Sequence, residues 1–177
     1  DLTRFPGADF VSVPLRILTA QKEYVDDAQL DATAMAQELK QYKGRSSTAC
    51  PNAADWEDAF SGADEVFALT ITSALSGSYN SAMAARALYL QEHPEAKVAV
   101  FDSLSTGPEL RLILEKLQEC LGAGLDFERT VQQVEDYQKR TGLLFCLRSL
   151  HNMAQNGRVS KVAAAAVGVL GIRIVGT

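Results

Sequence analysis

Hydroxyl side chains crowd one short segment, residues 70–82, which includes Ser73 and Ser76. An apolar run at residues 65–69 precedes it and predicts a buried strand, and residues 79–92 follow with the apolar spacing of a helix. A strand-to-helix turn of this kind lies at the carboxyl edge of an α/β sheet, where ligands bind. The helix N-terminus offers unpaired N–H groups and a positive dipole end, and serines add neutral donors. The pattern therefore favours capture of a carboxylate or phosphate.

Two further hydroxyl clusters accompany this turn. Residues 46–48 form one, which ends in Thr48 and comes shortly before Pro51, and residues 102–105 form the other, after a second predicted strand. Serine and threonine are also the preferred helix N-caps and common turn residues, so local capping is the alternative to ligand binding. Because two such clusters precede helices in one α/β unit, we favour a binding site over local capping.

The elements that must position these clusters alternate between strand and helix patterns. Strands are expected at residues 10–18, where Pro14 would break or bend the strand, and at 23–25, 65–69, 96–102, 143–147 and 172–175. Helices are expected at residues 31–42, 52–60, 79–92, 110–121, 126–137, 149–155 and from 160 onward. Asp31 or Thr33, Asn52 and Asp126 are the expected N-caps. The alternation predicts an α/β fold with a largely parallel sheet and flanking helices.

The pattern changes after Thr141, and a strand opens just before the last residue, Thr177. We therefore expect an N-terminal α/β domain over residues 1–140. Residues 141–177 would be the beginning of a second, C-terminal α/β domain that is truncated here.

Composition narrows the function classes. The chain has 177 residues, 47% of them hydrophobic, and a formal net charge of -5 without a basic run, which argues against nucleic-acid binding. We see no apolar stretch of membrane-spanning length and no signal peptide. The three cysteines lack C-x-x-C spacing and predict free thiols in a reducing cytoplasm.

Motifs for several kinds of chemistry are absent from the sequence. It contains neither of the glycine-rich nucleotide cradles, G-x-x-x-x-G-K-[ST] and G-x-G-x-x-G, and no G-x-S-x-G nucleophile elbow. His93 and His151 are the two histidines, and neither lies in a triad context or at metal-ligand spacing. We expect a binding site without catalytic residues, metal or cofactor. The alternative is a small-molecule enzyme, or a regulatory module for another carboxylate or phosphate, at the same turn.

Four motifs occur in an order that resembles the DegV family. They are S-S-T-A-C-P at 46–51, T-S-A-L-S-G-S-Y-N-S-A at 72–82, D-S-L-S at 102–105 and N-G-R-V-S-K at 156–161. DegV proteins are bacterial fatty-acid-binding proteins, and some are the lipid-carrying subunit of fatty acid kinase. The resemblance covers residues 10–175 and implies a two-domain α/β protein with a long-chain fatty acid between its domains and a separate kinase subunit as partner.

The resemblance also implies site residues. A threonine and a serine of the family contact the fatty-acid carboxylate, and these positions fall on Thr48 and Ser73. We add Ser76 from the same turn and Arg158 from the last motif, which would face the head group or the partner. Cys50 replaces the glutamine usual in the family's first loop, so the surroundings of the head group would differ.

Overall fold

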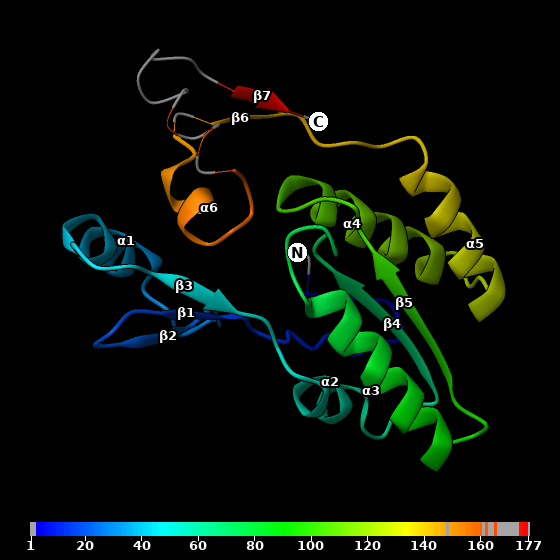
Figure 1. Cartoon of the computed structure of the whole chain (residues 1–177). Coiled ribbons are helices and arrows are strands. Elements are labelled where there is room, and N and C mark those ends of the chain that lie inside the picture. Colours follow the sequence, from blue (N-terminus) through cyan, green and yellow to red (C-terminus); the bar gives the residue numbers. More distant parts are fainter. Residues whose placement is uncertain (1–2, 148, 161, 163–164, 166–173, 177) are drawn as a thin grey trace. The chain divides into compact units, whose positions relative to one another are not determined.

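The computed structural model describes residues 3–147, 149–160, 162, 165 and 174–176 (Figure 1). The chain divides into two compact units. Unit 1 consists of Asp1–Val13 and Pro51–Leu143, and unit 2 consists of Pro14–Cys50 and Leu144–Thr177.

Unit 1 contains two parallel strands between helices. Its elements are α2 (Ala53–Phe60), β4 (Glu65–Thr70), α3 (Ser78–Glu92), β5 (Lys97–Asp102), α4 (Pro108–Gly122) and α5 (Phe127–Gln138). The parallel register runs from Glu65 opposite Lys97 to Thr70 opposite Asp102. Figure 1 shows α2 and α3 on one side of this pair and α4 and α5 on the other.

The side chains of β4 and β5 alternate between two hydrophobic cores, as the two-residue period of a strand requires. Ala68 and Val98 pack into the core of α2 and α3, together with Trp56, Phe60 and Tyr89. The intervening residues of both strands pack into the core of α4 and α5; this core comprises Phe67, Leu69, Ala99, Phe101, Ile113, Leu117 and Val134 with their neighbours. Burial on both faces explains why the two strands have continuous apolar sequences.

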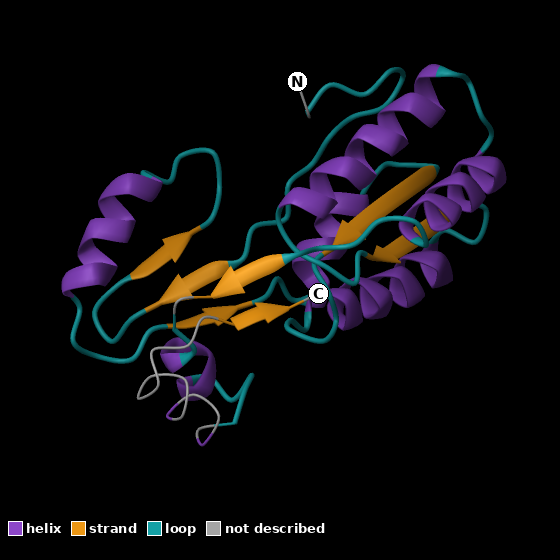
Figure 2. Cartoon of the chain, turned by 90° about the horizontal axis from the view of Figure 1, so that it is seen from above, coloured by secondary structure: helices purple, strands orange, loops and turns teal. Residues whose placement is uncertain are grey.

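The described part of unit 2 is built from short antiparallel strands and helices (Figure 2). Its elements are β1 (Arg16–Leu18), β2 (Glu23–Val25), α1 (Ala32–Gln41), β3 (Ser47–Ala49), β6 (Phe145–Leu147), α6 (His151–Gln155) and β7 (Ile174–Gly176). The first sheet has the order β2-β1-β3, and β6 pairs with β7.

Three helices begin at the predicted caps. Asp31 accepts a hydrogen bond from the Ala34 N–H, and Asp126 accepts one from the Arg129 N–H. At α2 a complete capping box forms, in which Asn52 and Asp55 each accept from the other's backbone N–H. These caps fix where α1, α2 and α5 start.

The α/β fold class is confirmed, whereas two local predictions are wrong. The first strand covers residues 16–18 rather than 10–18, because backbone pairing with β2 and β3 begins only at Arg16, beyond Pro14. Residues 47–49, predicted as loop, form β3 because they pair with β1. Most of the helix predicted from residue 160 lies outside the described residues, and β7 covers residues 174–176 of the final strand.

The two units differ in outline from the domains expected at 1–140 and 141–177. One division falls at residue 143, but Pro14–Cys50 groups with the C-terminal segment rather than with Pro51–Leu143. Hydrogen bonds join the two parts of unit 2: Arg45 donates to Asn156, and Asn156 donates to the carbonyl of Ser46.

Candidate functional site

The turns after β4 and β5 form a continuous edge, because the two parallel strands end in register. We call residues 71–77 and 103–107 the β4–β5 rim. The Thr72 N–H donates to the carbonyl oxygen of Ser105 at 2.8 Å and so ties the two turns together. Two of the hydroxyl clusters singled out from the sequence therefore belong to one site in unit 1.

Several hydroxyls of the rim and its flanks are buried and stabilise the turns. Ser103 and Ser105 are 2% and 3% exposed, and the Ser103 hydroxyl donates to the Ser105 carbonyl at 2.9 Å. The Ser105 N–H in turn donates to the Ser103 hydroxyl at 3.1 Å. The D-S-L-S motif thus stabilises its own turn, which is the local role that the sequence left open.

Ser73 is different, because its side chain is exposed. Its N–H donates to the carboxylate of Asp102, at 3.1 Å to Oδ1 and 3.3 Å to Oδ2. The backbone donor of Ser73 is therefore already engaged, and contact of its exposed hydroxyl with a ligand stays a prediction.

Ser76 has a clear local role. Its hydroxyl accepts from the Ser78 N–H at 3.2 Å and lies 3.0 Å from the Ser78 hydroxyl. The N-cap residue of α3, Gly77, has no side chain to cap the helix. The Ser76 hydroxyl therefore accepts a backbone N–H at the start of α3, which would otherwise lack a partner within the helix. Contact of Ser76 with a ligand stays a prediction.

Asp102 ends β5 beside this rim, and the sequence reasoning missed the role of its carboxylate. Besides the Ser73 N–H, it accepts the Leu104 N–H at 3.0 Å. Leu104 has a positive φ of 54°, which is uncommon for a leucine, and its side chain is 77% exposed. The signal in the sequence was an acidic residue at the end of a buried strand, next to a turn.

In unit 2 the structure brings together Thr48 and Arg158, which are 110 positions apart. The Arg158 Nη2 donates to the Thr48 Oγ1 at 3.0 Å. Thr48 lies on β3 opposite Ile17, and its side chain is exposed. A hydroxyl that accepts one hydrogen bond still has its own proton, so Thr48 can donate to an anion beside a guanidinium.

Cys50 follows β3 and is partly exposed, so the position that departs from the family pattern lies two residues from Thr48. All three cysteines are free. Burial raises the pKa of the Cys120 thiol in the core of unit 1.

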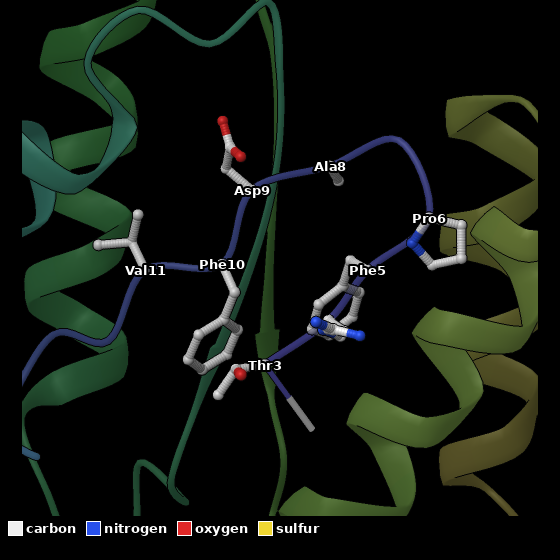
Figure 3. A pocket seen from close by; sticks show the side chains of 8 residues that line it. Thr3, Phe5, Pro6, Ala8, Asp9, Phe10 and Val11 are labelled. Atoms are coloured by element: carbon white, nitrogen blue, oxygen red, sulfur yellow. The ribbon is translucent and has the colours of Figure 1, made fainter. Parts of the chain in front are cut away.

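A concavity of about 880 Å³ lies at the N-terminal segment of unit 1 (Figure 3). Its lining consists of Thr3, Arg4, Phe5, Pro6, Ala8, Asp9, Phe10 and Val11. The rings of Phe5 and Phe10 stack there with centroids 5.8 Å apart. None of the four predicted ligand-binding residues lines this concavity.

Within the part of the chain that the structure describes, three or more His, Cys, Asp or Glu side chains nowhere gather as a metal site would need. Among the same residues, no helix combines the length and apolar character needed to span a membrane.

A family model described as an uncharacterised protein of the DegV family matches residues 5–177. A DegV domain-containing protein of Streptococcus pneumoniae is 46% identical over 167 residues, which are 94% of this chain and 59% of that protein. One of Streptococcus gordonii is 43% identical over 168 residues, 95% of this chain and 60% of that protein. The chain thus spans about three fifths of the length of these curated relatives.

Solved structures show the same likeness. A DegV family protein from Eubacterium eligens, loaded with heptadecanoic acid, has a TM-score of 0.88 and 52% identity over 98% of this chain and 63% of its own. The Streptococcus pneumoniae Fatty Acid Kinase (Fak) B3 protein, loaded with linoleic acid, has a TM-score of 0.90 and 46% identity over 95% of this chain and 60% of its own.

Proposed function

The chain belongs to the DegV family, and from that premise we propose that it binds a long-chain fatty acid and presents it to a partner kinase. The observation that carries the proposal is the fatty acid held by two relatives of 52% and 46% identity, one of which is named as a fatty acid kinase protein. The kinase would transfer the terminal phosphoryl group of ATP to a carboxylate oxygen and so form an acyl phosphate and ADP. We assign this activity to the cytoplasm.

We assign the carboxylate to the hydroxyls of Ser73 and Thr48, with Ser76 and Arg158 as further contributors. Support comes from the exposure of both hydroxyls and from the positive charge that Arg158 places 3.0 Å from Thr48. A hydrogen bond to a charged group contributes about 1.5–3 kcal/mol, so a few such bonds suffice to orient the head group.

The tail supplies most of the affinity in this proposal. Burying a methylene group contributes about 0.8 kcal/mol, so about 14 methylenes of a palmitate-like chain contribute about 11 kcal/mol before immobilisation costs. The hydroxyls would then determine where the carboxylate lies rather than whether the lipid stays bound. Neutral donors also leave the carboxylate nucleophilic enough to accept a phosphoryl group.

We propose further that this chain contributes substrate and no catalytic base. Its two histidines, His93 and His151, lie in neither of the candidate hydroxyl clusters. A carrier of this kind needs a kinase subunit for every turnover. Hydrolysis of esters or nucleotides by the isolated protein would contradict this part of the proposal.

Mass spectrometry of lipid extracted from the purified full-length protein tests the binding. We expect about one long-chain fatty acid per protein molecule, and a protein without acyl chains after growth in several media would contradict the proposal.

A Ser73→Ala variant tests the division between head and tail. Loss of one hydrogen bond to the carboxylate should slow acyl-phosphate formation by about tenfold to a hundredfold, while the lipid content stays close to that of the wild type. Ser61→Ala, an exposed serine that lies before β4, is the matched control. Equal loss of lipid and of phosphorylation in Ser73→Ala would contradict the assignment.

A further inference from the structure

The carboxylate of Asp102 accepts a hydrogen bond from the backbone N–H of Ser73, the residue proposed to hold the head group. Its Oδ1 accepts both the Ser73 N–H at 3.1 Å and the Leu104 N–H at 3.0 Å. Asp102 ends β5 and Ser73 follows β4, so this side chain crosses from one strand end to the turn of the other.

The position of Asp102 is fixed from several directions. The side-chain amide of Gln138 on α5 donates to the Asp102 carbonyl at 2.9 Å. The turn that follows is held by the buried pair Ser103 and Ser105. Leu104 keeps its positive φ in this setting, and such strain persists only where the surroundings determine the backbone firmly.

No ion pair neutralises the negative charge of Asp102 in the part of the chain that the structure describes. Among the described residues, no lysine, arginine or histidine side chain forms a salt bridge with it. Since the Ser73 hydroxyl and N–H belong to one residue, the carboxylate lies within about 7 Å of the hydroxyl. An anion bound at that hydroxyl is therefore repelled in proportion to its own charge.

We propose that Asp102 is a positioning residue that makes the Ser73 site selective by charge. It holds the Ser73 turn and takes the backbone N–H, so that the head group binds through the hydroxyl. Its charge admits a singly charged carboxylate and disfavours a more negative head group, including the acyl phosphate that the proposed kinase reaction forms. This inference rests on the proposed function and adds product release to it.

The test compares three ligands of equal chain length that differ in head-group charge: a fatty alcohol, a fatty acid and an alkyl phosphate. Dissociation constants are measured by calorimetry on the delipidated full-length protein. Asp102→Asn keeps the Oδ1 acceptor for the Ser73 and Leu104 N–H groups and removes the charge. Asp64→Asn is the matched control, because this exposed aspartate precedes β4 at the opposite end of the strand.

We expect Asp102→Asn to leave alcohol binding unchanged and to tighten fatty-acid binding by about threefold to tenfold, as repulsion between two charges at about 6 Å predicts. The alkyl phosphate, with up to two charges, should gain about tenfold to a hundredfold. A purely structural role would change all three affinities alike. Should Asp102→Asn fail to fold, Asp102→Ser, which keeps a short acceptor, is expected to give the same order.

Equal changes for the three ligands, or the same result in Asp102→Asn and Asp64→Asn, would overturn the inference. That outcome leaves fatty-acid binding by the wild type intact. A wild-type protein that binds no fatty acid would instead contradict the proposed function, and the charge-selection inference would fall with it.

Discussion

Thr48 shows how a single residue can combine an exposed hydroxyl with a neighbouring positive charge. Arg158 donates to its oxygen at 3.0 Å, which leaves the hydroxyl proton to point at an anion. The guanidinium also polarises the hydroxyl and makes it a better donor. The arrangement suits a carboxylate held by a neutral group and steadied by a nearby cation.

Substitutions at Thr48 separate its hydroxyl from its volume. Thr48→Val keeps the shape and removes the donor, so we expect acyl-phosphate formation to fall about tenfold with lipid content retained. Thr48→Ser keeps the hydroxyl and should stay close to the wild type. Phosphorylation assays with the purified kinase and lipid mass spectrometry give the two readouts. Indistinguishable rates for the valine and serine variants would remove Thr48 from the site.

The hydroxyl clusters that contain Ser73 and Thr48 are a local pattern and were visible in the sequence. The resemblance to the DegV family singled out these two hydroxyls within the clusters, and their contact with a ligand stays a prediction. The contact between Arg158 and Thr48 joins residues 110 positions apart, and no local pattern encodes it. The sequence places Asp102 at the end of a predicted strand, but it does not show which groups the carboxylate contacts, because these are backbone N–H groups.

At the scale of elements, α1 is attached to the β1–β2 hairpin through one carboxylate. Glu38 on α1 accepts hydrogen bonds from the Tyr24 hydroxyl and from the Lys22 ammonium, the latter at 2.9 Å. These two donors lower the pKa of Glu38, and the hydrogen bond to Glu38 raises the pKa of Tyr24 and of Lys22.

Because the pKa of Glu38 is lowered, the stability of this part of unit 2 depends on pH in the acidic range. Its contribution is fully present above the pKa of an unfolded glutamate, about 4.3, and is lost as the pH falls through the lower pKa of the folded state. In Glu38→Gln, the free energy of unfolding, measured by urea denaturation, should therefore fall less steeply as the pH is lowered through the acidic range. Glu92→Gln, at an exposed glutamate with no such partners among the described residues, is the control and should leave this pH dependence unchanged.

Elements with strong local signals were predicted well, and those that depend on distant pairing were not. The capping residues Asn52 and Asp126 marked the starts of α2 and α5 because caps act within one turn of helix. The strand β3 was taken for loop because Ser47 and Thr48 become strand only through pairing with β1, about thirty residues earlier in the chain.

At the scale of the whole molecule, a bound fatty acid should stabilise the folded protein by mass action. At a free concentration of about 100 times the dissociation constant the gain is about 2.7 kcal/mol, which raises the melting temperature by several degrees in a protein of this size. Calorimetric scans of lipid-loaded and delipidated full-length protein measure this shift. The methyl ester of the same acid lacks the anionic head group and should raise the melting temperature less; equal shifts would show that the head group is not recognised.

The composition of unit 2 also bears on how the chain acquires its fold during synthesis. Pro14–Cys50 emerges from the ribosome before Pro51–Leu143, and Leu144–Thr177 emerges after both. Most of unit 1 is continuous and can fold as soon as it is made, whereas the contacts of Arg45 and Thr48 with Asn156 and Arg158 must wait for Leu144–Thr177. The early strands β1–β3 therefore stay exposed on the nascent chain longer than the segments of unit 1. We expect chaperones to bind preferentially to these strands.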